Sequence, residues 1–178
     1  MSVLSESRPA VLAPTRLRLP DLLRATDYCA DDVLAGRYNR LLPTGGLPID
    51  ERWYHRLYGD DELDIWLISW VPERSTELHD HGGSLGALTV VSGALSETRW
   101  DGRGLRQRTL DAGSQAGFPL GWVHDVVLAS GQDATPASPT LSVHAYSPPL
   151  TAMSYYDVTD RDTLRRVRTE LTDTPEGD

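Results

Sequence analysis

Two short segments rich in histidine and glycine constrain this chain more than any other part of its sequence. Residues 78–86 contain His79 and His81, and residues 119–124 end in a third histidine, His124. Side chains at positions i and i+2 of a β-strand point to the same face, so the first two histidines share one face of a strand. With the third delivered from another strand, the three imidazoles form a facial set of metal ligands. We therefore expect β-structure built around a three-histidine metal site.

The spacing of glycine and proline around these histidines is also informative. Four residues separate His81 from Gly86, six more precede Gly93, and Pro119 stands five positions before His124. This spacing resembles the two signature motifs of the cupin superfamily, small β-barrels that carry a metal inside. The usual first motif has a glutamate where this chain has Gly86. The resemblance therefore implies a metal held by three histidines without a carboxylate.

Length and composition fit one globular domain over residues 1–178, long enough to bury a sizeable core. The chain has 26 acidic against 17 basic residues and a net charge of −9, which argues against nucleic acid or an anionic membrane as a partner. Its single cysteine, Cys29, excludes an internal disulfide, fits a reducing cytosol and is expected to be a small buried hydrophobe. No apolar run approaches about 18 residues, and no secretion signal is recognised at the N-terminus. We expect a cytoplasmic monomer or weak homo-oligomer.

The order of patterns along the chain predicts an all-β fold, a cupin barrel of the jelly-roll type with a helical element at each end. Residues 1–15 are predicted to form a loosely docked N-terminal arm. Residues 16–50 are predicted to form a short helical cap, with Asp21 and Asp31 as helix-start signals. Within residues 51–158, short apolar runs separated by glycine turns predict the strands of the barrel. These strands are expected near residues 62–71, 88–91, 94–100, 105–110, 124–128, 141–146 and 153–158.

Residues 159–178 are predicted to form a C-terminal helix and tail. Thr159 or Asp160 serves as the helix cap, and the helix runs over residues 161–171. Leu164, Val167 and Leu171 would then lie on one stripe.

A second chemical pattern is Ser142-Val143-His144-Ala145-Tyr146. The spacing of i, i+2 and i+4 places a hydroxyl, an imidazole and a phenol along one strand face. Taken alone, the pattern also fits a hydrogen-bonded group in a core. The fifth histidine, His55, is expected at the rim of the site or on the surface.

Together these residues resemble the cysteine dioxygenases, a thiol dioxygenase branch of the cupins. The resemblance covers residues 53–157 approximately and rests on Tyr54-His55-Arg56, Trp70, His79-Asp80-His81, His124 and Ser142-Val143-His144-Ala145-Tyr146-Ser147-Pro148-Pro149. It implies that His79, His81 and His124 bind Fe(II). It also implies that Arg56 and Tyr54 clamp the substrate carboxylate, that Tyr146 faces the sulfur and oxygen, and that His144 orients Tyr146 with Ser142 as a further partner.

The chain departs from the animal members of this family at Gly86. Those members carry a cysteine there and join it covalently to the tyrosine that matches Tyr146. Because Gly86 has no thiol, that link cannot form here, and the resemblance is to the bacterial members.

The ligand set itself favours thiol chemistry. Three neutral imidazoles leave a divalent metal its full charge and about three open positions in octahedral geometry. A thiolate suits these positions because metal binding favours the deprotonated sulfur, although the pKa of a free thiol is about 8.5. An amine of the same molecule can close a chelate, which leaves one position for O2. The expected reaction is the oxidation of L-cysteine to cysteine sulfinic acid.

Two other functions stay open from the sequence. A dioxygenase for 3-mercaptopropionate or another small thiol would share the three-histidine iron site, but the clamping position in that branch is typically glutamine, so Arg56 favours cysteine. The other is a non-catalytic metal-binding cupin, against which Ser142, His144 and Tyr146 argue. Three histidines also suit zinc, nickel or copper, so the choice of iron rests on the resemblance.

Overall fold

The computed structural model describes residues 16–72, 76–132, 135 and 137–175. Within them lie one α-helix, one short 3-10 helix and eleven strands, so the predicted mainly-β class is confirmed. The elements are α1 (Leu19–Leu34), η1 (Asn39–Leu41), β1 (Trp53–Gly59), β2 (Asp64–Trp70), β3 (His79–Asp80), β4 (Leu85–Ser92), β5 (Ala94–Trp100), β6 (Leu105–Asp111), β7 (Gln115–Phe118), β8 (His124–Leu128), β9 (Thr140–Ser147), β10 (Ala152–Val158) and β11 (Leu164–Leu171). The arm predicted over residues 1–15 lies outside the described residues.

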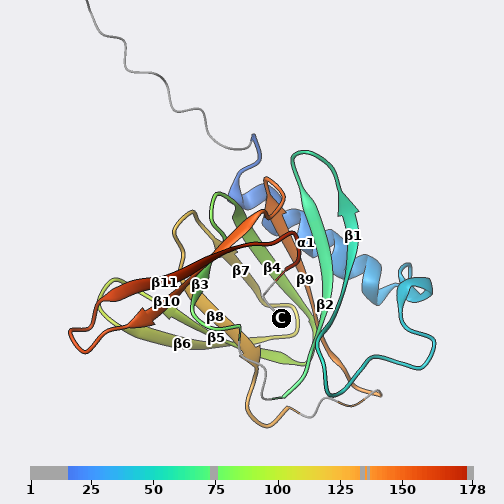
Figure 1. The fold of residues 1–178 in the computed structure, drawn as a ribbon. Helices are drawn as coiled ribbons and strands as arrows, with labels where there is room; N and C mark the ends of the chain where they lie inside the picture. The colour runs from blue at the N-terminus through green and yellow to red at the C-terminus, as the bar shows by residue number, and fades with distance from the viewer. Residues whose placement is uncertain (1–15, 73–75, 133–134, 136, 176–178) are drawn as a thin grey trace, which may run out of the picture.

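The strands form two antiparallel sheets around a shared core (Figure 1). The five-stranded sheet has the order β1-β2-β9-β4-β7, and the six-stranded sheet has the order β11-β10-β3-β8-β5-β6. Among the described residues no strand ladder joins one sheet to the other. The predicted jelly-roll barrel is therefore formed by two packed sheets and is not closed in the described residues.

The strands β2 and β9 are buried along their whole length because both of their faces are covered. Trp66 and Ile68 of β2 belong to the core between the sheets, while Ile65 and Leu67 pack on the side of α1. Near-continuous apolar runs suit strands that are covered on both sides. Each fully buried Leu or Ile side chain contributes about 1.5–3 kcal/mol relative to an exposed one. This two-sided packing makes the centre of the five-stranded sheet a firm support for polar groups on its inner face.

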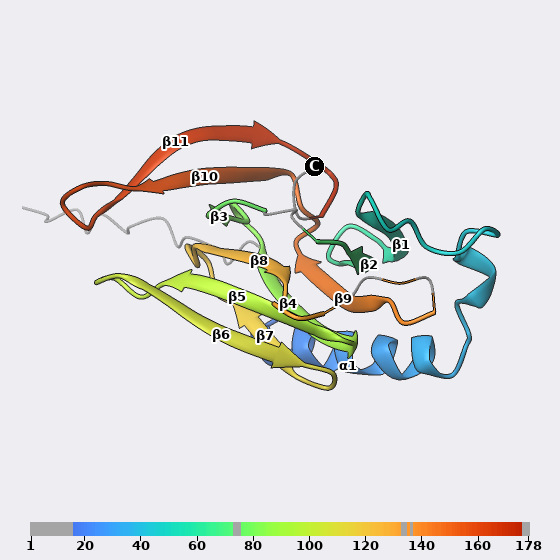
Figure 2. The same ribbon diagram turned by 90° about the horizontal axis from the view of Figure 1, so that it is seen from below.

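The helix α1 covers the outer face of the five-stranded sheet (Figure 2). Asp21 lies in its first turn and accepts a hydrogen bond from the backbone N–H of Arg18, the N-cap residue, at 2.9 Å. Asp31 lies inside the same helix, so the second helix start predicted there is wrong. No helix of the described residues is both long and apolar enough to cross a membrane.

The C-terminal helix predicted over residues 161–171 is also wrong. The chain forms the edge strand β11 there, antiparallel to β10. Thr159 and Asp160 belong to the turn between these two strands, where Asp162 adopts a φ of 51°. The apolar residues that suggested a helical stripe lie on a mostly exposed strand, and Leu171 is 90% exposed.

Candidate metal centre

The three histidines of the two sequence segments come together between the sheets. His79 of β3 and His124 of β8 are direct partners in the β3–β8 ladder, and His81 follows β3. All three side chains are buried, and their ring centroids are separated by 4.9–5.2 Å. One nitrogen from each ring lies within 4.8 Å of the other two. The predicted triad therefore forms a compact three-nitrogen cluster that can hold a metal ion.

Two hydrogen bonds fix which nitrogen of two rings carries the proton. Nδ1 of His79 donates to the main-chain oxygen of Glu77 at 2.8 Å, and Nδ1 of His124 donates to Oε1 of Glu97 at 3.1 Å. A carbonyl oxygen and an ionised carboxylate can only accept, so Nδ1 carries the hydrogen in both rings. Nε2 then keeps the lone pair that a metal needs.

Glu97, which no motif in the sequence singles out, is the carboxylate that contacts His124 in the candidate centre. Its side chain is fully buried and also accepts hydrogen bonds from Nε1 of Trp122 at 3.1 Å and from Nε of Arg108 at 2.5 Å. Burial raises the pKa of Glu97, but the hydrogen bonds from His124 and Trp122 and the nearby positive charge outweigh burial and lower this pKa to about 2. The ionised carboxylate thus orients His124 from behind. Alternation along β5 could have revealed it, since Glu97 shares a strand face with the buried Leu95.

The residues present fit a metal held by histidines alone. Gly86, which replaces the usual glutamate, is a direct ladder partner of Phe118. A Cβ atom added to Gly86 would lie 2.9 Å from Cδ2 of Phe118 and 3.4 Å from Nδ1 of His81. The ring of Phe118 is fully buried and occupies the space beside the cluster. Three neutral nitrogen donors in a buried site suit a divalent transition metal.

The strand β9 carries a hydrogen-bonded chain beside this cluster. Nε1 of Trp70 donates to Oγ of Ser142 at 2.8 Å, Nε2 of His144 lies 3.0 Å from the same oxygen, and Nδ1 of His144 lies 3.2 Å from the hydroxyl of Tyr146. Ser142, His144 and Tyr146 have no exposed surface. The ring centroid of Tyr146 lies 5.0 Å from that of His81. The predicted pair of His144 and Tyr146 is therefore next to the three-histidine cluster.

The direction of the hydrogen bonds in this chain depends on the tautomer of His144. An indole N–H can only donate, so Ser142 accepts from Trp70. The two contacts of His144 fit either tautomer, because the Ser142 hydroxyl can donate to Nε2 or accept a second hydrogen from it. With the ring hydrogen on Nδ1, His144 donates to the oxygen of Tyr146, and the phenol keeps its own hydrogen to donate.

Tyr54 and Arg56, the predicted clamp, lie on β1 at the edge of the five-stranded sheet. The Tyr54 ring meets that of Trp66 edge-on at 5.9 Å, and Cζ of Arg56 lies 5.6 Å from the Trp66 ring centroid. Arg56 is the ladder partner of Trp66, which in turn is the partner of His144. The clamp residues thus share a sheet face with the β9 chain, with β2 between them. In the described part of the protein no hydrogen bond joins Arg56 or Tyr54 to the residues of that chain.

Two other residues singled out in the sequence lie away from the cluster. His55 is half-buried on β1 and stacks on Trp53, whose side chain packs with the core under α1. Cys29 is half-buried on α1 and packs against the same core, where burial raises the pKa of its thiol. Neither belongs to the candidate centre.

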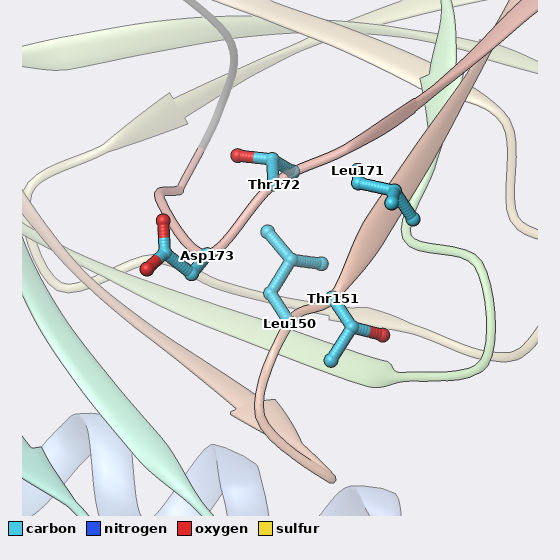
Figure 3. A pocket seen from close by; sticks show the side chains of 5 residues that line it. All are labelled: Leu150, Thr151, Leu171, Thr172 and Asp173. Carbon is cyan, nitrogen blue, oxygen red and sulfur yellow. The ribbon is translucent and has the colours of Figure 1, made fainter.

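A separate hollow of about 330 Å³ lies where β11 ends (Figure 3). Its lining residues are Leu150, Thr151, Leu171, Thr172 and Asp173. Leu150 also belongs to the core that contains Tyr146. The hollow therefore borders that core, but its lining includes none of the predicted site residues.

The chain is similar in fold to several solved structures. Among solved structures, the polyketide cyclase RemF from Streptomyces resistomycificus is 16% identical, with a TM-score of 0.50 and coverage of 62% of this chain and 75% of that chain. An uncharacterized conserved protein with a double-stranded β-helix domain from Klebsiella pneumoniae is 15% identical, with a TM-score of 0.47 and coverage of 73% and 93%. The Cnp3 cupin domain of Schizosaccharomyces pombe is 5% identical, with a TM-score of 0.46 and coverage of 60% and 67%. These likenesses concern the fold alone.

A family model described as cysteine dioxygenase type I matches residues 46–159. The matched segment contains the three-histidine cluster, the β9 chain and the clamp residues of β1. It also covers more than half of the 178 residues. The chain therefore belongs to the cysteine dioxygenase type I family.

Proposed function

We propose that this protein is a non-haem Fe(II) thiol dioxygenase that oxidises L-cysteine with O2 to cysteine sulfinic acid. The observation that carries the proposal is the buried cluster of His79, His81 and His124 beside Tyr146, in a chain of the cysteine dioxygenase type I family. The reaction adds both oxygen atoms of O2 to the sulfur of the thiol and needs no other oxidant.

The three histidines would hold the iron through Nε2 of His79 and His124 and one ring nitrogen of His81. Bound Fe(II) supplies open coordination positions at which a thiolate and O2 can react. Glu97 and the main-chain oxygen of Glu77 keep two of the rings in the tautomer that binds metal. A metal without a carboxylate ligand keeps its full charge, which favours an anionic sulfur.

Tyr146 and His144 would act on the sulfur and oxygen. In the His144 tautomer with the hydrogen on Nδ1, the chain from Trp70 through Ser142 and His144 leaves the Tyr146 phenol with a hydrogen to donate. Its ring lies next to that of His81, and its hydroxyl is hydrogen-bonded to His144. A rigid donor at this place can stabilise negative charge on an oxygen atom during the reaction.

Arg56 would bind the substrate carboxylate, with the Tyr54 hydroxyl as a second donor. The guanidinium is planar and presents its donors as a fork that matches a carboxylate. Cysteine offers a thiolate and an amine to the metal and a carboxylate to Arg56. 3-Mercaptopropionate lacks the amine, and cysteamine lacks the carboxylate.

The test is oxygen uptake by the iron-loaded protein with cysteine, cysteamine and 3-mercaptopropionate. We expect cysteine to be oxidised best, with both atoms of labelled O2 in the sulfinic acid. A charge-assisted hydrogen bond contributes roughly 1.5–3 kcal/mol. Arg56→Gln should therefore lower kcat/KM for cysteine by about ten- to a hundredfold, while cysteamine should change little.

Each step of the proposal has a result that would contradict it. Faster oxidation of 3-mercaptopropionate than of cysteine would assign the protein to that other thiol. An equal effect of Arg56→Gln on cysteine and cysteamine would make Arg56 structural. No oxygen uptake with any thiol would leave a metal-binding cupin.

A further inference from the structure

The strand β2 carries two buried polar groups that the proposed reaction leaves unused, Asp64 and Trp66. Their exposed fractions are 2% and 7%. The Trp66 indole lies close enough to the Asp64 carboxylate to lower its pKa, but neither Oδ1 of Asp64 nor Nε1 of Trp66 makes a hydrogen bond of good geometry within the described part of the chain. A buried donor or acceptor without a hydrogen-bond partner lowers the stability of the folded state. Their presence side by side therefore points to a role outside the core packing.

The strand register places Asp64 between the β9 chain and the clamp. Asp64 is the ladder partner of Tyr146 on one side and of Gly59 on the other. Directly paired residues share a sheet face, so the Asp64 carboxylate lies on the inner face in line with Tyr146.

The Arg56 side chain runs over Gly59, directly across from Asp64. A Cβ atom added to Gly59 would lie 3.2 Å from Cδ of Arg56, 3.4 Å from Nε and 3.6 Å from Cζ. The guanidinium thus occupies the space that a side chain at Gly59 would take, and it also lies over Trp66. Burial raises the pKa of Asp64, while the Trp66 indole, the Leu150 amide and the positive charge of Arg56 oppose the rise.

We infer that Asp64 is a positioning residue of the substrate site, which holds the Arg56 guanidinium over Trp66 so that its other edge faces a substrate carboxylate. This inference rests on the proposed function. A guanidinium has five donors in a rigid fork, so it can donate to Oδ1 of Asp64 and to a carboxylate at the same time. A hydrogen bond from Arg56 would give the buried Asp64 oxygen a partner both before and after substrate binds. This arrangement also explains the glycine at position 59, because any side chain there would displace Arg56.

The test compares Asp64→Asn with wild type on cysteine and cysteamine. Neighbouring groups couple by about 0.5–3 kcal/mol, so we expect Asp64→Asn to raise KM for cysteine by about three- to tenfold. The value of kcat for cysteine and both constants for cysteamine should stay close to wild type. In the Arg56→Gln background, Asp64→Asn should add nothing further, because Asp64 acts through Arg56. Asp61→Asn is the matched control, since Asp61 is an exposed residue of the turn before β2 and should leave KM unchanged.

Two readings separate this inference from the proposed function. Equal effects of Asp64→Asn on cysteine and cysteamine, or full additivity with Arg56→Gln, would overturn the positioning role. Urea unfolding of the wild type, the two single variants and the double variant measures the Asp64–Arg56 coupling without any substrate. If Asp64 and Arg56 are coupled but the protein oxidises no thiol, the proposed function is refuted and the interaction between the two side chains stands. If the two variants show no coupling, the interaction itself is refuted. If Asp64→Asn does not fold, Asp64→Glu moves the carboxylate by one methylene and should raise KM for cysteine selectively.

Discussion

At the scale of single residues, Gly86 stands where the animal cysteine dioxygenases that the sequence resembles carry a cysteine. It is the ladder partner of Tyr146 on one side and of Phe118 on the other. A cysteine at this place would face Tyr146 directly, which explains how other members form their covalent link. Here the space is filled by the Phe118 ring, which is fully buried and touches the rings of His81 and His124.

We expect Gly86→Ala to destabilise the protein and to loosen the metal site. The added Cβ would lie 2.9 Å from Phe118, whose buried ring cannot move without disturbing His81. Overpacking of this kind costs about 1–3 kcal/mol. Thermal unfolding and metal content measure the two effects. Gly83→Ala is the control because a Cβ there meets nothing within 4 Å, and equal behaviour of the two variants would contradict the packing role of Gly86.

We also expect Tyr146 to carry no covalent link to a cysteine. The single cysteine, Cys29, packs in the core under α1, whereas Tyr146 belongs to the core between the sheets. The five-stranded sheet separates the two side chains. Intact-mass analysis after turnover with cysteine should give the mass of the unmodified chain. A tryptic peptide pair joined at Tyr146 would show that the prediction is wrong.

At the scale of elements, the sequence predicts buried strands well and the exposed edge strand badly. Apolar or alternating runs in the sequence predict the strands β2, β5, β8, β9 and β10. The residues that resemble family motifs lie on these strands or beside them. The edge strand β11 has little buried surface, so its sequence lacks the alternation of apolar and polar residues that marks a half-buried strand. The spacing of Leu164, Val167 and Leu171 instead matches the period of a helix. Pairing with β10 makes this segment a strand, and the sequence of the segment alone does not reveal that pairing.

The difference between local spacing and strand register also separates the site residues that the sequence predicts from those that it does not. His79 and His81, like His144 and Tyr146, are two residues apart, so a local pattern is enough to identify them. Alternation along β5 indicates that Glu97 is buried, but its partner His124 depends on strand register, as do the ladder partners of Asp64. Register is set by packing of whole strands, so a local sequence pattern does not reveal these partners.

The hairpin of β10 and β11 has a consequence for the metal cluster. Arg168 of β11 pairs with Glu77 and Glu170 and lies over the Tyr155 ring, with its Cζ 3.7 Å from the ring centroid. Glu77 has a φ of 59°, and its main-chain oxygen orients His79. The hairpin therefore stabilises the position of Glu77, whose main-chain oxygen accepts the hydrogen bond of His79.

We expect Arg168→Ala to weaken metal binding while the fold is kept. Loss of a group that orients a ligand typically lowers metal affinity by about 10–100-fold. Arg168 acts one residue further away and is partly exposed, so we expect an effect below about tenfold. Competition of the protein with a chelator for cobalt measures the affinity. Arg165→Ala is the control, since Arg165 pairs with the exposed Asp157 on the same hairpin. Equal affinities in the two variants would contradict the support role of the hairpin.

At the scale of the whole molecule, the three-histidine cluster lies between two sheets that share one core. The cluster joins β3, the segment after it and β8, while the rings around it come from both sheets. Burial of three imidazoles side by side removes water from their ring nitrogens, which costs free energy when no metal is bound. Metal binding replaces that hydration, so the bound metal should stabilise the packing of both sheets.

Removal of the metal should therefore lower the unfolding temperature of the whole protein. A ligand present at 100 times its Kd stabilises the folded state by about 2.7 kcal/mol. For a chain of this size, 1 kcal/mol corresponds to roughly 2–4 °C in Tm, so the loaded protein should unfold about 5–10 °C above the chelator-treated protein. Scanning calorimetry with and without Fe(II), in the absence of oxygen, measures the difference. His124→Ala should lose most of this metal-dependent shift, whereas His55→Ala should keep it, because His55 stacks on Trp53 away from the cluster. A shift of equal size in His124→Ala and wild type would mean that the metal binds elsewhere.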